Sequence, residues 1–449
     1  MNLFKRSKRE KKRKVVVIGI DGVPYSFLRQ QMAAGVMDHF TRLVEKGSFN
    51  RMNSVIPTVS SVAWSSYMTG KNPGKHNIYG FVDRHPNPLE IFIPTSSHMK
   101  GETLWEILSR NGIKVVVMNV PVTYPPREVS GVLVSGFLAT KLEKAVYPQS
   151  LSAKLEEMGY RIDVDAWQAH QDKEKFLQDL HHTLERRIEM AFYLMDHQEW
   201  DFFQVHIMET DRINHFLWEQ WESEDETYAP EFVRFYREID RFLGEMESKL
   251  GDEIELIILS DHGFCTLKKE VFVNRWLEEK GYLTLRDGEK RALADIETGS
   301  KAYSLIPGRI FVNLKGREQM GSVDAGKGYE QVREELIGEL PTMVDPDTGE
   351  RIIKAVYKRE ELYSGPCFEQ APDLVAVPED GYDLKGNLDR EKLTHKGPLV
   401  GMHTFEDAAL YVRGREISAE DFSITDLMPT ILALMGVPVP EDADGSALF

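Results

Sequence analysis

Three aspartates stand where chemistry is expected, because each one comes just after an apolar run that is typical of a buried strand. They are Asp21, Asp211 and Asp261, and the runs cover residues 15–20, 202–207 and 254–259. In an open parallel sheet the ligand site lies beyond the carboxyl ends of the strands, so these carboxylates are expected to share one rim. Carboxylates that converge repel one another and take up protons unless cations neutralise them. The pattern therefore predicts a metal site.

Histidines accompany these aspartates along the chain. His215 follows Asp211 by four residues, a spacing that puts both side chains on one face of a helix. His262 directly follows Asp261, and His403 precedes a further apolar run at residues 408–412. Three imidazoles among carboxylates favour zinc, with manganese or iron as alternatives. The composition of the site therefore predicts divalent metal ions, most readily zinc.

The elements that must position these groups alternate between strand and helix. A strand pattern at residues 115–120 joins the three above, and helical patterns fill the intervals between them. The helical patterns cover residues 27–47, 104–110, 173–196 and 425–436. This alternation predicts an α/β fold with a mostly parallel central sheet and helices on both faces.

The domain organisation predicted from the sequence is one catalytic domain at residues 15–449 behind a basic disordered tail at residues 1–14. A stretch rich in turns and short strand patterns, at about residues 271–397, separates the Asp261 region from His403. We expect this stretch to be an insertion that covers the site like a cap.

Five motifs in a fixed order resemble those of the alkaline phosphatase superfamily, and most of all its type I phosphodiesterase and nucleotide pyrophosphatase branch. The motifs are Ile20-Asp21-Gly22, Pro57-Thr58-Val59-Ser60, Asp211 with His215, Ser260-Asp261-His262-Gly263, and Gly401-Met402-His403. The resemblance implies two metal ions. One would be held by Asp21, Ser60, Asp261 and His262, and the other by Asp211, His215 and His403.

The same resemblance implies that Ser60 is the nucleophile. Ser60 is preferred to Thr58 and Ser61 because it matches the second threonine of the family's Pro-Thr-x-Thr pattern. A serine hydroxyl is a weak nucleophile at neutral pH, and a divalent cation can stabilise its alkoxide. The expected activity is metal-dependent hydrolysis of a phosphoester, as in a phosphodiesterase or nucleotide pyrophosphatase, through a phosphoserine intermediate.

Alternatives of two kinds remain open from the sequence. A phosphotransferase or mutase of the same superfamily would pass the phosphoryl group to a second hydroxyl, and a catalytically inactive binding protein could keep the fold. In the diesterase branch an asparagine about twenty residues past the nucleophile helps hold the phosphoryl oxygen, whereas this chain has Phe81 there. That difference leaves the preference for monoesters or diesters open.

Four further histidines are interpreted as solvated or core residues, and a fifth lies closer to the nucleophile. His76 and Lys71 follow the nucleophile closely enough to be weighed as substrate contacts, against the alternative of a capped loop. The residues interpreted as structural are His39, His181, His182 and His206.

Charge and cysteine content limit the partners. The formal net charge is -17, although residues 1–14 hold eight basic residues and one acid. An acidic body repels nucleic acid, so we expect a small phosphorylated substrate instead. Two cysteines form no disulfide framework, and no apolar run reaches the ~20 residues that span a bilayer. We therefore expect a cytoplasmic enzyme, with weak peripheral membrane contact by the basic tail as a further option.

Overall fold

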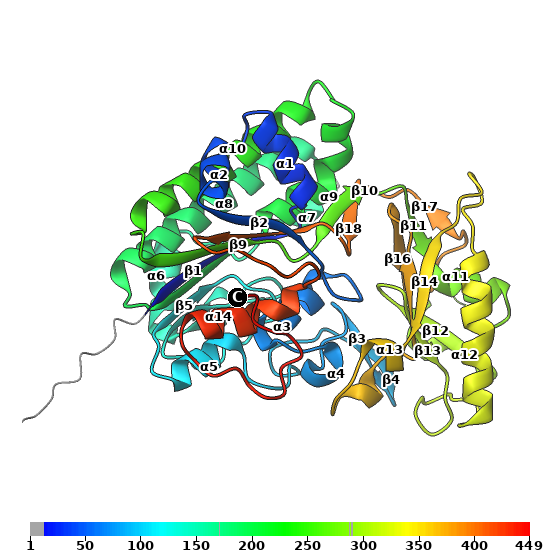
Figure 1. Ribbon diagram of the computed structural model, residues 1–449. Helices are drawn as coiled ribbons and strands as arrows, with labels where there is room; N and C mark the ends of the chain where they lie inside the picture. Colours follow the sequence, from blue (N-terminus) through cyan, green and yellow to red (C-terminus); the bar gives the residue numbers. More distant parts are fainter. Residues whose placement is uncertain (1–12, 170, 287, 289–290) are drawn as a thin grey trace, which may run out of the picture.

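The computed structural model describes residues 13–169, 171–286, 288 and 291–449, so most of the predicted basic tail lies outside the described residues. Its centre is an eight-stranded sheet with the order β2-β19-β9-β1-β8-β5-β6-β7 (Figure 1). The five strands from β9 to β6 run parallel, and β2, β19 and β7 are antiparallel to their neighbours. The strands are β1 (Lys14–Ile20), β2 (Gly47–Met52), β5 (Val115–Met118), β6 (Gly131–Val134), β7 (Val146–Tyr147), β8 (Phe202–Ile207), β9 (Ile254–Leu259) and β19 (Ala408–Arg413).

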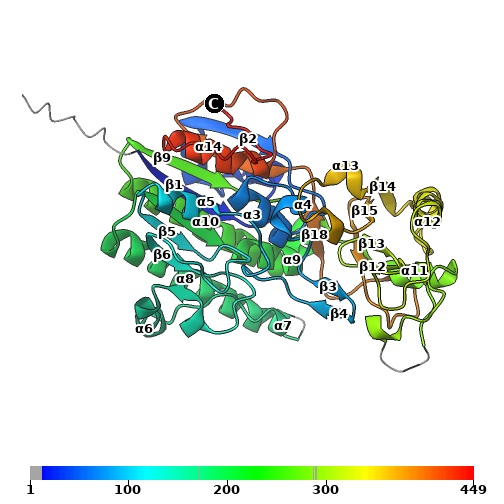
Figure 2. The same ribbon diagram turned by 90° about the horizontal axis from the view of Figure 1, so that it is seen from below.

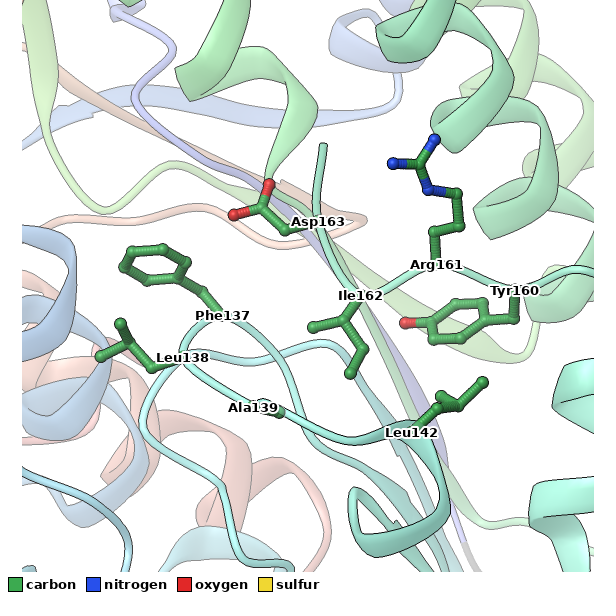
Figure 3. A pocket seen from close by; sticks show the side chains of 8 residues that line it. All are labelled: Phe137, Leu138, Ala139, Leu142, Tyr160, Arg161, Ile162 and Asp163. Atoms are coloured by element: carbon green, nitrogen blue, oxygen red, sulfur yellow. The ribbon is translucent and has the colours of Figure 1, made fainter. Parts of the chain in front are cut away.

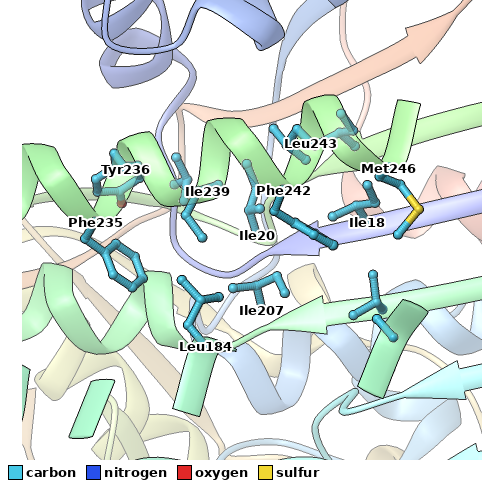
Figure 4. Close-up of a cluster of buried hydrophobic side chains, with 14 of the residues drawn as sticks. Ile18, Ile20, Leu184, Ile207, Phe235, Tyr236, Ile239, Phe242, Leu243 and Met246 are labelled. Carbon is cyan, nitrogen blue, oxygen red and sulfur yellow. The ribbon is translucent and has the colours of Figure 1, made fainter. Parts of the chain in front are cut away.

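Helices cover both faces of this sheet, which confirms the predicted fold class. Alternate side chains of β1 belong to opposite cores, with Val16, Ile18 and Ile20 on one face and Val15 and Val17 on the other. Figure 4 shows Ile18, Ile20 and Ile207 under the apolar side of α10. Helices of the first face are α1 (Tyr25–Ala33), α2 (Asp38–Val44), α8 (Lys173–His197), α9 (Glu209–Glu222) and α10 (Tyr228–Lys249), and those of the second are α3 (Ser60–Thr69), α5 (Leu104–Arg110) and α14 (Leu427–Leu434).

The helical pattern at residues 27–47 does not form one helix, and that prediction was wrong. The chain makes α1 and α2 instead, with a break after Ala34. Gly35 has φ 68°, and the N–H groups of Gly35 and Val36 donate to the carbonyls of Met32 and Gln31. This is the hydrogen-bonding pattern of a helix that ends on a left-handed glycine, so the local stop signal overrides the continuous apolar spacing.

The other helix predictions hold more closely. α5 has the predicted bounds, because Thr103 and Glu106 form a capping box at its start and Gly112 with φ 70° follows its end. α8 extends one residue past the predicted range. The helix expected at residues 425–436 begins as a short 3-10 turn at Ile424–Asp426 and continues as α14.

Residues 269–395 build smaller sheets at one side of the main sheet (Figure 2). A four-stranded sheet has the order β12-β13-β15-β14, and a three-stranded sheet has the order β16-β11-β17. The extent of an inserted domain stays a prediction. The strands are β11 (Lys269–Phe272), β12 (Ala302–Leu305), β13 (Arg309–Val312), β14 (Ile353–Lys358), β15 (Leu374–Pro378), β16 (Tyr382–Lys385) and β17 (Thr394–His395), and the helices are α11 (Val273–Glu279), α12 (Lys327–Glu339) and α13 (Arg359–Leu362).

The described residues also form two short antiparallel strand pairs, three short α-helices and several 3-10 turns. β10 pairs with β18, and this pair carries His403. Among the described helices, none is long and apolar enough to cross a membrane. The remaining elements are β3 (Asp83–Pro86), β4 (Leu89–Phe92), β10 (Gly263–Thr266), β18 (Gly401–Thr404), α4 (Pro73–His76), α6 (Ser152–Glu157) and α7 (Ala166–Ala169).

Replacing Gly19 of β1 by alanine should destabilise the protein. An added Cβ would lie 2.6 Å from Trp64 Cη2 and 3.1 Å from His206 Cδ2, both in buried side chains. Crowding of this kind costs about 1–3 kcal/mol of unfolding free energy. Gly338→Ala is the matched control, since Gly338 lies in α12 with nothing within 4 Å of the added Cβ. Thermal unfolding of both variants checks this, and equal stability of the two would contradict the packing described.

Candidate active site

Four of the residues predicted to hold a metal ion meet at the carboxyl ends of β1 and β9. Asp21 follows β1, Asp261 and His262 follow β9, and Ser60 is the first residue of α3. The Ser60 hydroxyl lies 3.2 Å from Asp21 Oδ1 and 3.2 Å from His262 Nε2. His262 Nε2 is also 3.4 Å from Asp261 Oδ2. All four side chains are buried, so they form one compact polar group inside the protein.

Asp21 is held in place by two residues that the sequence did not single out for the site. Its Oδ2 lies 2.8 Å from Trp64 Nε1 and 2.8 Å from His206 Nε2. His206 was interpreted as a core histidine, and it is buried, but its partner is a site carboxylate. The feature that reveals this role is the pairing of β8 with β1, which places His206 opposite Gly19. With Oδ2 occupied in this way, Oδ1 of Asp21 faces Ser60 and His262.

Asp211, His215 and His403 form a second group. Asp211 and His215 lie on α9, and His403 lies on β18, which is paired with β10 directly after His262. His403 Nε2 is 3.2 Å from Asp211 Oδ1 and 3.0 Å from His215 Nε2. The two groups touch, because the rings of His262 and His403 stack with centroids 3.8 Å apart. The structure thus brings all seven predicted residues to one end of the sheet.

The backbone orients the imidazoles toward the centre of each group. His262 Nδ1 lies 3.0 Å from the Gly263 carbonyl, and His215 Nδ1 lies 2.8 Å from the Gly401 carbonyl. A carbonyl oxygen only accepts, so Nδ1 carries the proton and Nε2 presents a lone pair. This is the arrangement that metal-binding histidines use, with the second nitrogen fixed by a hydrogen bond.

Two carboxylates and one imidazole of the site have shifted pKa values, each for a different reason. Burial and the charges of Asp21 and Asp211 raise the pKa of Asp261 well above its ordinary value. Burial also acts on Asp211, but His215 and His403 together hold the pKa of Asp211 well below its usual range. Burial, supported by the nearby His403, lowers the pKa of His262 to about 3, so this imidazole is neutral at physiological pH.

The donor atoms fit divalent cations. In each of two groups, Asp21 with Asp261 and His262, and Asp211 with His215 and His403, one donor atom per residue lies within 4.8 Å of the others. Asp261 Oδ2 is buried and has no hydrogen-bond partner in the described part of the chain. A buried carboxylate oxygen with no hydrogen-bond partner lowers the stability of the folded protein, and a bound cation would remove this cost. His215 Nε2 and His403 Nε2 lie 3.0 Å apart, and a cation bound between them could use both nitrogens as ligands.

Arg212 borders the second group. Its Nη1 lies 3.3 Å from Asp211 Oδ2, and its Nη2 lies 2.5 Å from Asp163 Oδ2. Its guanidinium also stacks on Phe137, 4.6 Å from the ring centroid. Asp163 and Phe137 lie on two neighbouring segments of the chain, and both line a shallow hollow of about 420 Å³ (Figure 3). Arg212 therefore fixes Asp211 from the side opposite the histidines.

A larger cavity of about 520 Å³ opens beside the second group. His215 and His403 line it, with side chains 18% and 14% exposed, and so do Thr58 and Val59 just before Ser60. Phe81, which stands where the resemblance led us to expect an asparagine, lines it as well. Residues of β15 and β16 also line it. Two histidines of the second group are thus accessible from a cavity that the smaller sheets help to form.

His76 and Lys71 are engaged in contacts that support the loop interpretation. His76 is fully buried with Nε2 3.0 Å from Ser66 Oγ, and Lys71 Nζ lies 2.5 Å from Asp442 Oδ2.

Three other histidines that the sequence indicated to be structural make contacts of that kind or face solvent. His39 Nδ1 lies 2.7 Å from Arg42, His181 Nδ1 lies 2.8 Å from Glu238, and His182 has a side chain 54% exposed.

Comparison with known proteins gives consistent results. The sequence model of the family described as type I phosphodiesterase / nucleotide pyrophosphatase matches residues 15–406. Phosphonoacetate hydrolase from Sinorhizobium meliloti 1021, in complex with phosphonoacetate, superposes with a TM-score of 0.64 at 16% identity, covering 95% of both chains. Murine ectonucleotide pyrophosphatase / phosphodiesterase 5 gives a TM-score of 0.57 at 16% identity, covering 96% of this chain and 98% of that chain. No curated protein sequence matches the chain. The structural similarities support the same fold.

Binding of a divalent metal should release protons and tighten as pH rises. The pKa of Asp261 lies well above its ordinary value, so a metal ion that binds this carboxyl would compete with a proton there. Apparent affinity should rise about tenfold per pH unit for each proton displaced. Zinc titration calorimetry in buffers of different ionisation enthalpy measures the release. Asp261→Asn should weaken binding and reduce the pH dependence, whereas a pH-independent affinity of the unaltered protein would contradict this account.

Proposed function

The chain belongs to the type I phosphodiesterase / nucleotide pyrophosphatase family and is a phosphoester hydrolase, and on this premise we propose that Ser60 is its nucleophile at a centre of two divalent metal ions. The observation that carries the proposal is the position of the Ser60 hydroxyl, 3.2 Å from both Asp21 Oδ1 and His262 Nε2. One ion would be held by Asp21, Ser60, Asp261 and His262, and the other by Asp211, His215 and His403. Zinc suits this donor set best, and manganese is the alternative.

Two cations bound there would stabilise the Ser60 alkoxide and screen the charge on the phosphoryl oxygens. The chain's own residues supply the geometry. Trp64 and His206 hold Asp21 so that its free oxygen faces Ser60. Ser60 opens α3, and the first N–H groups of a helix have no acceptor within the helix. They are therefore suited to bind a phosphoryl oxygen.

The proposed reaction has two displacements at phosphorus. Ser60 Oγ forms a bond to phosphorus as the bond to the leaving alcohol breaks, and the alcohol oxygen takes a proton. The product of this step is a phosphoserine. Water then attacks phosphorus, the bond to Ser60 Oγ breaks, and Ser60 regains its hydroxyl proton. Both steps need an in-line approach, which the fixed position of Ser60 beside the two groups favours.

The substrate is proposed to be small. The cavity of about 520 Å³ beside His215 and His403 is of the size that takes a small molecule. The strongly acidic chain, with a formal net charge of -17, disfavours nucleic acid.

A cytoplasmic location is proposed as well, supported by Cys265 and Cys367 being free thiols. Peripheral membrane contact by the basic tail stays a prediction, since residues 1–12 lie outside the described residues.

Ser60→Ala should abolish turnover while the protein still folds and binds metal. Loss of the nucleophile removes the covalent step, so the rate with a nitrophenyl phosphoester should fall by about 10³-fold or more. Ser61→Ala is a matched control, because the Ser61 hydroxyl is buried next in sequence and has no hydrogen-bond partner among the described residues. Metal content and thermal unfolding of both variants verify that they are intact.

Acid quenching during turnover should trap phosphate on Ser60, which mass spectrometry of a proteolytic digest detects. Unchanged rates in Ser60→Ala would exclude Ser60 as nucleophile. Phosphate released in proportion to substrate consumed separates hydrolysis from transfer to a second hydroxyl.

A further inference from the structure

The cavity beside His215 and His403 has more acidic than basic side chains in its lining. The smaller sheets and the loops around them contribute most of these charges. The carboxylates are Glu379, Asp380, Asp383, Glu406 and Asp407. The cations are Arg51, Lys354 and Lys385.

Each of these cations is already paired with a carboxylate of the same cavity. The pairs are Arg51 with Asp407 at 2.8 Å, Lys354 with Glu406 at 3.6 Å, and Lys385 with Asp383 at 2.5 Å. Lys385 also lies 3.6 Å from Glu270. An anionic group that entered the cavity would have to compete with these carboxylates for a cation.

Asp380 provides the excess negative charge. Glu379 pairs with Arg351, which is not part of the lining, whereas Asp380 makes no ion pair with a described residue. Burial and the charges of Glu406 and Glu379 raise the pKa of Asp380, although Lys354 opposes them. Asp380 thus sits in a locally negative environment and is exposed enough to meet a ligand.

Much of the rest of the lining is apolar, and part of that surface is aromatic. Phe81 and Phe264 contribute ring faces or edges, and Pro307, Leu399 and Met402 contribute aliphatic surface. Aromatic rings and carboxylates together attract organic ammonium groups, whereas the same carboxylates repel anions.

We propose that this cavity receives the organic group of the phosphoester and selects a group without negative charge, with a small organic ammonium group preferred. The inference rests on the proposed function, which places phosphorus at Ser60 and the two metal groups. At that position the metal ions of the proposed centre would neutralise the negative charge of the phosphoryl group. The organic group extends past His215 and His403 into a region where its own charge meets Asp380. A polyphosphate chain directed into the cavity would be disfavoured for the same reason.

A matched series of esters tests this selection. Phosphate is esterified with choline, with its uncharged isostere 3,3-dimethylbutanol, or with 4-hydroxybutanoate, which carries a carboxylate. Each is prepared as the 4-nitrophenyl diester and as the simple monoester, so that either preference of the enzyme is covered. We expect kcat/KM to fall in the order choline, dimethylbutyl, carboxylate, with about tenfold or more between the extremes because one unit charge changes sign near Asp380.

Asp380→Lys should reverse the order of kcat/KM for the two charged esters, because the side chain that meets the organic group then carries the opposite charge. Asp324→Lys is the matched control. Asp324 also lies in the segment at residues 269–395, but its side chain is 77% exposed and is not part of the cavity lining. That variant should keep the original order.

Equal or faster cleavage of the carboxylate ester by the unaltered enzyme would overturn the inference, and so would an unchanged order in Asp380→Lys. If none of the esters is cleaved, the proposed function itself fails and the inference falls with it.

Discussion

The architecture of the site depends on three buried carboxylates that meet at one end of a parallel sheet. Asp21, Asp211 and Asp261 are 0–3% exposed, and the pKa values of Asp211 and Asp261 move in opposite directions as a result of their surroundings. Such a concentration of negative charge is unfavourable in a low-dielectric interior. The three histidines, and Asp261 Oδ2 with no hydrogen-bond partner among the described residues, point to bound cations as the groups that would make this concentration of charge stable.

Much of this arrangement can be predicted from the sequence, because each apolar run ends where its strand ends and an aspartate follows soon after. β8 and β9 have the predicted bounds, and both lie next to β1, so Asp21, Asp211 and Asp261 emerge at the same edge. The placement of His403 could not be derived from its own surroundings. It depends on β18 pairing with β10 from a distant part of the chain, and only the resemblance to a family anticipated it.

The residues that sequence reasoning missed act through contacts between elements. His206 looks like any core residue of an apolar strand, and its role beside Asp21 requires the register between β1 and β8. Trp64 lies on α3, and it reaches Asp21 because Gly19 leaves space on the strand. The break between α1 and α2 has a simpler cause. The apolar spacing continues through this segment, whereas the backbone hydrogen bonds end the first helix at Gly35. The net charge of the cavity could not be predicted from the sequence. It depends on how β15, β16 and the segment after β18 come together in the fold, and no local sequence pattern indicates that.

The account stands on the claim that cations hold the two groups together, and anomalous diffraction from crystals grown with zinc tests it most directly. Data collected on both sides of the zinc absorption edge should show two peaks per chain. One should lie among Asp21, Ser60, Asp261 and His262, and the other among Asp211, His215 and His403. Zinc-saturated crystals with no peak between these side chains, or with peaks only at other places, would contradict it.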